Sequence, residues 1–350
     1  MTSPNHPPLP MLITGIAGVA GFNAFHYFRR RYGDKVIGVR QPSMWPLSGP
    51  GIIPCELTDS LAVQQLWQEH RFGSVISSLG SCRLKSCETD PDMAYRVNVL
   101  GTENVLRHAA RYDARVLHTS IDLVFAGREP DESHSGYVET DRADPVTVYG
   151  AMMVRAEQVV LDQCPDACVL RISLPMGISF NGHAGAIDWI ASRFKQGKPA
   201  TLYFDEVRTP TFTDCLCRLL ADLLNRPLAG IYHAGGPRRI SLYQIAQVVN
   251  VVGGHDPSLL HGCMRRQAGP MPPRAGDVSL NCDKLVEYLG RQPFDPWPID
   301  DRLVPTHRDW HHAPDDLPED FQVGEQSVAQ LLYQNPRRPE PVPKSRRQQT

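Results

Sequence analysis

The sequence predicts an α/β fold, a doubly wound parallel sheet with helices on both faces and a smaller C-terminal lobe. Two observations predict it. Between Met11 and about Arg171, short apolar runs alternate with amphipathic stretches, the rhythm of parallel strands and crossover helices. The first apolar run also leads directly into a glycine-rich turn that opens a helix, and doubly wound sheets commonly begin in this way.

The elements of the sheet follow from the period of the apolar residues. The expected strands are residues 11–14, 35–39, 52–55, 74–79, 115–120 and 168–171. The expected helices between them are residues 21–31, 60–71, 92–112 and 149–163. Each strand is therefore followed by a connection long enough to return the chain to the same edge of the sheet.

Beyond Arg171 the alternation loosens, which indicates a less regular lobe. Helices are expected at 184–196, 213–225, 241–252 and 281–289, with Ser241 and Asn281 as N-caps and a strand at 230–233. We expect residues 1–10 to be disordered, 11–178 to form the sheet domain, and 179–292 to form mainly a substrate-binding lobe. Within that lobe, residues 209–225 and 230–233 should pack back onto the sheet domain. We expect residues 293–350 to form a proline-rich, partly disordered extension with one helix at 320–334.

Composition narrows the function classes. A formal net charge of −2 provides no global field for nucleic acid or acidic membranes. No window holds the roughly 18 apolar residues that a membrane span needs, and the N-terminus lacks the layout of a secretory signal. The nine cysteines form no CxxC pair, which favours reduced thiols and no metal site. We therefore expect a cytoplasmic protein that binds small molecules.

The glycine turn, residues 14–21, is the strongest single motif. Gly15 permits the tight turn, Gly18 lets the backbone approach a pyrophosphate, and Gly21 lets the helix pack against the strand. The helix N-terminus then directs N–H groups and a positive dipole end at the phosphates. This motif predicts a Rossmann-type dinucleotide site, with backbone contacts from Gly15, Ile16, Ala17, Gly18, Val19 and Gly21.

The second strand indicates which dinucleotide binds. An acidic residue at its end would select NAD, whereas this chain has Arg40, whose guanidinium suits the 2′-phosphate of NADP. NADP is therefore favoured over NAD. Glu56, after the third strand, suits an adenine contact or is an ordinary loop acid, and both interpretations stay open. Leu57 and Leu79 complete the expected cofactor contacts.

Further motifs follow the glycine turn in a fixed order. They occupy residues 90–99, 122–127, 137–141, 145–150, 171–177, 208–211, 230–233 and 279–285. As a set they resemble the extended short-chain dehydrogenase/reductase superfamily. Within it the chain is most similar to dTDP-4-dehydrorhamnose reductases and to the regulatory beta subunits of methionine adenosyltransferase. The resemblance spans roughly residues 11–290.

The resemblance implies a catalytic set, and this chain departs from it. In the family, a Ser or Thr orients the substrate carbonyl, a Tyr exchanges its proton, a Lys four residues later lowers the tyrosine pKa, and an Asn supports the Lys. Tyr149 and Asn98 match. The hydroxyl position is Ile121, with Ser120 as the candidate substitute. The lysine position is Met153, which keeps a place beside the cofactor but carries no charge.

This departure leaves two interpretations open. Without a nearby cation, we expect the pKa of Tyr149 to remain near about 10. The first interpretation is an NADP-dependent reductase of a keto-sugar nucleotide or a similar ketone, impaired by Ile121 and Met153. The second is a non-catalytic dinucleotide-binding protein that regulates another enzyme. A homodimer and a complex with a partner enzyme both fit these interpretations.

The resemblance also implies a nucleotide-sugar site between the sheet and the second lobe. Arginine suits its diphosphate because the guanidinium pairs bidentately with phosphate oxygens. The candidate substrate-binding residues are Asp122, Phe180, Asn181, Arg208 and Arg274.

Overall fold

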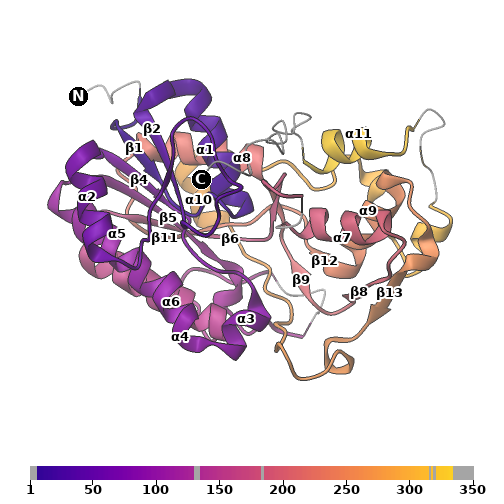
Figure 1. Cartoon of the computed structure of the whole chain (residues 1–350). Helices are drawn as coiled ribbons and strands as arrows, with labels where there is room; N and C mark the ends of the chain where they lie inside the picture. Colours follow the sequence, from indigo (N-terminus) through magenta and orange to yellow (C-terminus); the bar gives the residue numbers. More distant parts are fainter. Residues whose placement is uncertain (1–5, 130–134, 183–184, 315–316, 318–320, 334–350) are drawn as a thin grey trace.

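The computed structural model describes residues 6–129, 135–182, 185–314, 317 and 321–333. Two lobes lie side by side, the larger built around the sheet and the smaller around α7 (Ala186–Lys195) and α9 (Leu242–Gly253) (Figure 1). None of the helices within these ranges is both long and apolar enough to cross a membrane.

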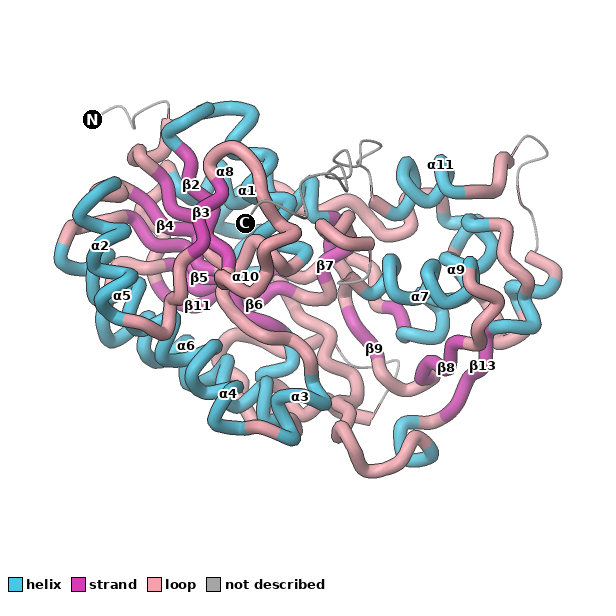
Figure 2. Tube along the Cα trace, viewed as in Figure 1, coloured by secondary structure: helices cyan, strands magenta, loops and turns pink. Residues whose placement is uncertain are grey.

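The large lobe contains a seven-stranded sheet in the order β11-β6-β5-β4-β1-β2-β3, and every pairing in it is parallel (Figure 2). Its strands are β1 (Met11–Ile13), β2 (Val36–Arg40), β3 (Ile52–Pro54), β4 (Ser74–Ser77), β5 (Arg115–Ile121), β6 (Cys168–Ile172) and β11 (Gly230–Ala234). The predicted fold class is confirmed. The strand order reverses between β1 and β4, and ligands bind in such sheets at the carboxyl ends beside this reversal.

Helices cover both faces of the sheet, and alternate residues of β1 face opposite sides. Met11 and Ile13 belong to the core beneath α1 (Val19–Tyr32) and α8 (Thr213–Leu224), whereas Leu12 faces the core of the other side. The helices of that other side are α2 (Ser60–His70), α5 (Gly101–Arg111) and α6 (Val148–Gln163). A strand buried on both faces reads as a continuous apolar run, which explains why the strands were recognisable in the sequence.

One expected helix is divided in three. The stretch predicted as 92–112 forms α4 (Pro91–Tyr95), a π-helical turn (Arg96–Leu100) and α5. Such π turns occur often at functional sites, and this one carries Asn98. A short helix before it, α3 (Leu84–Thr89), was not predicted.

The small lobe is held together by pairs of short strands. These are β7 (Pro175–Met176) with β10 (Thr211–Phe212), β9 (Val207–Arg208) with β12 (Ile240–Ser241), and β8 (Ala200–Tyr203) with β13 (Leu260–Cys263). Ser241 caps α9 and forms a capping box with Gln244. The chain then returns to the large lobe, where α10 (Asp283–Leu289) packs beside β11 and begins after Cys282, with the Asn281 side chain accepting the Asp283 N–H at 2.9 Å.

Short helical turns complete the described structure. They are Gly33–Lys35, Asp122–Val124, Pro257–Leu259, Arg265–Gln267, Asp301–Leu303 and Trp310–His312.

Described residues near both ends of the chain pack against the rest of the protein. The carbonyls of Pro8 and Pro10 accept hydrogen bonds from the start of β4, at 2.6 Å and 2.8 Å. In the C-terminal extension, Trp297, Trp310 and Leu332 are buried. The helix expected at 320–334 is reduced to α11 (Glu325–Ser327) and a π turn (Val328–Leu332). The parts of these predictions that concern residues 1–5, 318–320 and 334–350 lie outside the described residues.

Candidate functional site

Gly15 and Gly21 build a turn that no larger residue could form. Gly15 has φ +67°, and a Cβ there would lie 1.8 Å from the carbonyl oxygen of Ser78. A Cβ at Gly21 would lie 2.4 Å from the carbonyl oxygen of Gly15. The backbone of β1, the end of β4 and the first turn of α1 therefore approach each other more closely than side chains allow.

Gly18 serves a different purpose. It is the N-cap of α1, and a Cβ there would meet nothing closer than 3.4 Å, at the oxygen of Gly15. No packing contact demands a glycine, so the space in front of the helix N-terminus is free for a ligand. The first turn of α1 has no acidic residue, and the buried Oγ1 of Thr14 has no hydrogen-bond partner. Ile16 and Val19 are buried and Ala17 is half-buried around the same turn. The cradle thus fits a pyrophosphate.

Arg40 and Glu56 lie at the outer end of the cradle. The half-buried Arg40 ends β2 and donates from Nη1 to the carbonyls of Gln41 and Pro42 at 3.0 Å each. Its Nε is buried without a partner. The Glu56 carboxylate accepts from the N–H and hydroxyl of Thr58 at 3.1 Å and 2.9 Å, so it stabilises its own turn. Leu57 is buried beside it.

Asn98 and Met153 come together at the other end. The buried Asn98 accepts the Ser81 N–H at 2.6 Å through Oδ1, and its Nδ2 has no partner. A Cβ at Gly80 would lie 3.1 Å from Asn98 Oδ1 and 3.8 Å from Met153 Sδ. Leu79, half-buried, precedes this glycine. The loop after β4 therefore meets both the π turn and α6.

Tyr149 lies one turn before Met153 on α6 and is only 7% exposed. Burial raises the pKa of its hydroxyl well above the usual value, and Cys82 and Asp122 raise it further, while Arg208 lowers it. The pKa is thus higher than the sequence led us to expect, because desolvation disfavours the phenolate and no lysine compensates. Ile121, which is also buried, adds no hydrogen-bonding group.

Ser120 faces another region of α6. Its hydroxyl donates to Glu157 Oε1 at 2.5 Å, and Arg171 binds both oxygens of the same carboxylate at 2.9 Å and 2.8 Å. Glu157 follows Tyr149 by eight positions, about 12 Å along a helix axis. The Ser120 hydroxyl is thus held in a buried ion-pair cluster two turns away from the tyrosine.

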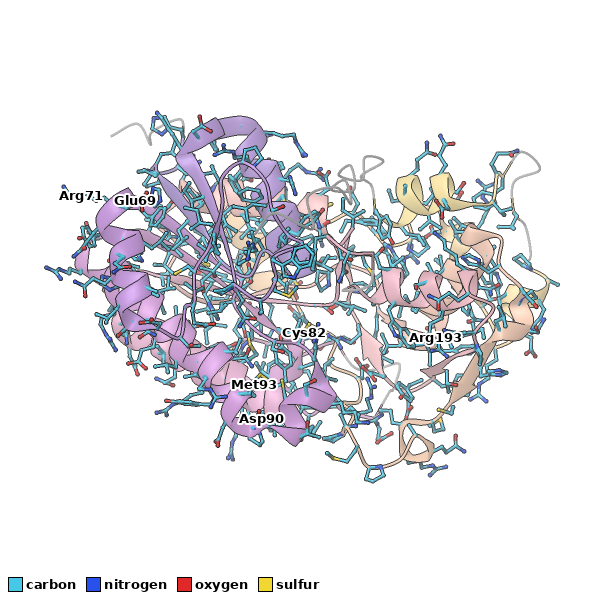
Figure 3. The ribbon with its side chains drawn as sticks, in the orientation of Figure 1. Glu69, Arg71, Cys82, Asp90, Met93 and Arg193 are labelled. Atoms are coloured by element: carbon cyan, nitrogen blue, oxygen red, sulfur yellow. The ribbon has the colours of Figure 1, made fainter. Side chains whose placement is uncertain are left out.

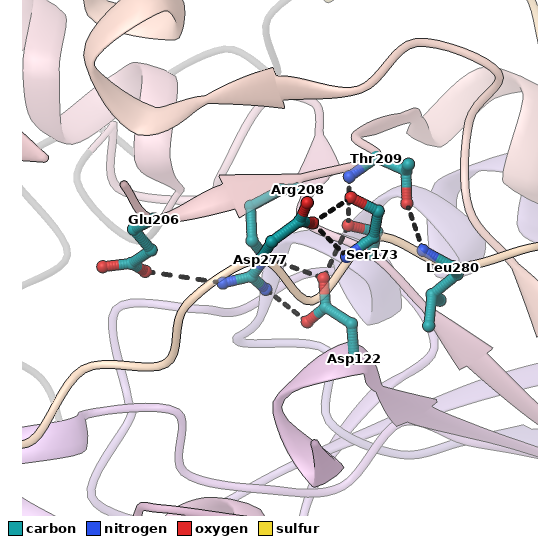
Figure 4. A network of polar contacts seen from close by, with 8 residues as sticks. Asp122, Ser173, Glu206, Arg208, Thr209, Asp277 and Leu280 are labelled. Atoms are coloured by element: carbon teal, nitrogen blue, oxygen red, sulfur yellow. Dashed lines mark hydrogen bonds and ion pairs between the residues drawn. The ribbon is translucent and has the colours of Figure 1, made fainter. Parts of the chain in front are cut away.

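Asp122 and Arg208, both candidate substrate-binding residues, form an ion pair with each other (Figure 4). Arg208, in β9, is 3% exposed and donates from Nε and Nη2 to the two Asp122 oxygens at 2.7 Å and 2.5 Å. The Ser173 hydroxyl adds a hydrogen bond to Asp122 at 2.6 Å. Burial raises the pKa of Asp122, and Arg208 and Ser173 oppose that shift. This bidentate pair joins the turn after β5 to the small lobe.

The remaining substrate candidates surround this pair. Glu206 lies 3.7 Å from both Arg208 and Arg274, and burial raises the pKa of its carboxyl. The Arg274 guanidinium lies over the Tyr203 ring at 4.9 Å. Phe180 is half-buried and Asn181 is exposed, in the loop after β7. Arg274 is therefore less enclosed than Arg208.

The sequence of this chain matches a known family over most of its length. Residues 10–298 match the model of the RmlD substrate binding domain. The chain belongs to the RmlD family. The methionine adenosyltransferase 2 subunit beta of Danio rerio is 25% identical over 291 residues, 80% of this chain and 84% of that protein.

Solved structures show the same fold. A dTDP-4-dehydrorhamnose reductase from Bacillus anthracis in complex with NADP has a TM-score of 0.66 and 21% identity, covering 81% of this chain and 94% of its own. The Bordetella bronchiseptica enzyme WbmH in complex with NAD+ has a TM-score of 0.66 and 18% identity, covering 82% and 93%. This RmlD-family chain therefore has the fold of proteins that hold a nicotinamide dinucleotide.

Sequence reasoning missed Cys82 of this RmlD-family protein. All nine cysteines are free, and Cys82 is the exposed one. It lies in the loop between β4 and α3, in the region between the two lobes (Figure 3), and is one of the groups that raise the pKa of Tyr149. The carboxyl end of a central strand is the signal that could have found it, because ligand contacts gather there.

Proposed function

We propose that this protein binds NADP in the glycine cradle and acts as a dinucleotide-binding regulatory subunit of another enzyme, with little or no reductase turnover. The observation that carries this proposal is the environment of Tyr149. Its hydroxyl is buried, Met153 replaces the cation of the family, and the positive charge of Arg208 is paired with Asp122.

The cradle supports the cofactor part of the proposal. Gly15 and Gly21 shape it, Gly18 leaves the helix N-terminus open, and Arg40 stands at the end of β2 where a 2′-phosphate would lie. Asn98 Nδ2, which has no partner, and Met153 would hold the nicotinamide ribose. When bound, the nicotinamide supplies a hydride to a carbonyl carbon, and a proton must then reach the carbonyl oxygen.

The reactive end supports the regulatory part. Tyr149 is the group that could donate that proton, and its raised pKa keeps the proton on the phenol. Ile121 cannot hydrogen-bond the carbonyl, and the Ser120 hydroxyl is bound to Glu157. Losing one preorganised donor typically lowers a rate by about 10²–10³. The loss of both the hydroxyl and the lysine should leave hydride transfer to a keto-sugar nucleotide very slow.

A slow reductase is the second candidate, because Tyr149 and Asn98 are retained beside Met153. The decisive experiment combines calorimetric titration with NADPH and single-turnover oxidation of NADPH by dTDP-4-dehydrorhamnose. We expect binding in the micromolar range or tighter, with oxidation at least about 10³-fold slower than in an enzyme with the complete set.

A double variant, Ile121→Thr/Met153→Lys, should restore part of the missing chemistry. We expect its single-turnover rate to rise about 10²-fold, because the lysine lowers the tyrosine pKa and the hydroxyl orients the carbonyl. Met152→Lys is the matched control, since it places the same charge on a neighbouring position of α6. A wild-type rate typical of an intact reductase would contradict the regulatory role.

The beta-subunit relative suggests which kind of partner to test. Its name identifies it as a subunit of a methionine adenosyltransferase. We expect the full chain, co-expressed in the cytoplasm with the methionine adenosyltransferase of its own source, to elute with it in a fixed ratio. Elution as a separate homodimer, with NADPH present, would argue against this partner.

A further inference from the structure

The C-terminal strap, residues 299–333, lies beyond the family match, which ends at residue 298. Its described part nevertheless packs on the small lobe. The Tyr243 hydroxyl and the Gln247 amide of α9 both donate to the Arg308 carbonyl at 2.9 Å. Trp310 and Tyr333 are each 1% exposed. A segment outside the family match is therefore built into the core of the small lobe.

The end of the strap reaches a buried carboxylate. The Tyr333 hydroxyl donates to Oδ1 of Asp188, a residue of α7 that is 3% exposed. The other oxygen, Oδ2, accepts the Ser179 N–H at 2.9 Å and the Ser179 hydroxyl at 2.5 Å. Asp188 thus links the strap to the loop after β7.

That loop lies against the cofactor helix. The Ile178 carbonyl accepts a hydrogen bond from Asn23 of α1 at 2.8 Å. At the far side of the loop, a Cβ on Gly185 would lie 3.0 Å from Cγ2 of Val19, the first residue of α1. Strap, Asp188, loop and the start of α1 therefore form one continuous series of contacts, and the cradle is at its end.

We propose that Tyr333 and Asp188 are positioning residues for the dinucleotide site, so that docking of the strap and binding of the cofactor strengthen each other. The proposal rests on the cofactor binding proposed above. Its physical basis is the cost of a buried carboxylate. Among the described residues, Asp188 accepts hydrogen bonds from the N–H and hydroxyl of Ser179 and from the hydroxyl of Tyr333, all of which are neutral donors. Removing one of these donors leaves the buried carboxylate without a hydrogen bond that it needs. The loop must then shift to restore the lost hydrogen bond.

The test compares two variants of the full chain. Tyr333→Phe removes the hydroxyl that binds Asp188. Glu325→Gln removes the exposed Lys195–Glu325 ion pair, which anchors the same strap without touching the loop. We expect Tyr333→Phe to weaken NADPH binding about five-fold in calorimetry, and Glu325→Gln to change it less than about two-fold. Because coupling is reciprocal, NADPH should slow hydrogen exchange of residues 325–333 in the wild type and less so in Tyr333→Phe.

Other outcomes separate the two proposals. Equal NADPH affinity in the wild type and Tyr333→Phe, with exchange of the strap unaffected by NADPH, would overturn the coupling and leave cofactor binding intact. A wild type that binds no NADPH would overturn both. If Tyr333→Phe does not fold, Ser179→Ala tests the same connection from the loop side and should weaken NADPH binding to a similar extent. An unchanged affinity in that variant would refute the coupling.

Discussion

The cofactor cradle and the reactive end of the same pocket have diverged to different degrees. The cradle depends on backbone geometry, and its glycines have kept the contacts that the turn requires. The reactive end depends on particular side chains, and Ile121 and Met153 have replaced two of them. Backbone sites tolerate changes in neighbouring side chains, whereas proton transfer does not. A dinucleotide site built from the backbone can therefore persist where the side chains for proton transfer differ.

One buried charge pair borders the reactive end, and a second lies two helical turns away along α6. Asp122–Arg208 and Glu157–Arg171 are both buried and bidentate. Each pair satisfies polar groups that a catalytic site would hold available for substrate. Thr14 Oγ1 in the cradle and Asn98 Nδ2 beside Met153 are, by contrast, buried without partners. A buried polar atom without a partner needs an explanation, and a bound dinucleotide would supply one for each of these two atoms.

The largest effects are expected in the cradle, where the variants Gly15→Ala and Gly18→Ala are compared. A Cβ at Gly15 would lie 1.8 Å from a backbone carbonyl at a positive φ, so we expect about 5 kcal/mol of destabilisation and no NADPH binding. Gly18→Ala meets no such contact and should keep the wild-type melting temperature. Its NADPH affinity should fall at least about ten-fold, because the methyl group occupies the approach to the pyrophosphate. Thermal unfolding and calorimetry measure both effects, and unchanged affinity in Gly18→Ala would remove the cradle as the cofactor site.

Arg208→Met tests the enclosed reactive end. It leaves Asp122 buried without its cation and should lower the free energy of unfolding by about 3–5 kcal/mol at about pH 8. Burial already raises the folded-state pKa of Asp122, and removing Arg208 raises it further. An acid with a raised folded pKa stabilises the fold most at low pH and loses that contribution as pH rises through the folded pKa. The deficit of the variant should therefore shrink at about pH 5, measured by urea unfolding.

The double variant Asp122→Asn/Arg208→Met is the control for that prediction. It removes both charges of the pair, so its deficit should be smaller than that of Arg208→Met and depend less on pH, with the remaining dependence coming from Glu206, which also loses Arg208. If Arg208→Met is as stable as the wild type at both pH values, the pair does not hold the lobes together. Arg208 would then be available for a phosphate, as its position in the motif suggested.

How far the sequence could predict this molecule differs between its parts. The strands and the cradle were predictable, because buried parallel strands and glycine turns have local signatures. The partners of Ser120 and Arg208 were not. Glu157 is 37 positions from Ser120 and Asp122 is 86 positions from Arg208, so only the folded chain shows that their polar groups are satisfied. The packing of the C-terminal extension was also not predictable. Its buried residues are isolated ones, Trp297, Trp310 and Tyr333, within a proline-rich stretch that shows no apolar period.

The smallest expected effect concerns which dinucleotide the cradle prefers. Arg40 holds its guanidinium across the carbonyls of its own loop at 3.0 Å, with Nε unpartnered. A 2′-phosphate there would gain charge-assisted hydrogen bonds that a 2′-hydroxyl cannot match. We expect Arg40→Ala to weaken NADPH binding about ten-fold and NADH binding less than about two-fold.

Lys35→Ala is the matched control, because it removes a cation from the opposite end of the same strand region. It should leave both affinities unchanged, since the lysine lies at the amino edge of the sheet, away from the cradle. Equal losses of NADPH and NADH in Arg40→Ala would mean that the arginine only orders its own loop. The pocket would then recognise the pyrophosphate and nicotinamide without distinguishing the ribose, which fits a sensor of total dinucleotide better than one of NADP alone.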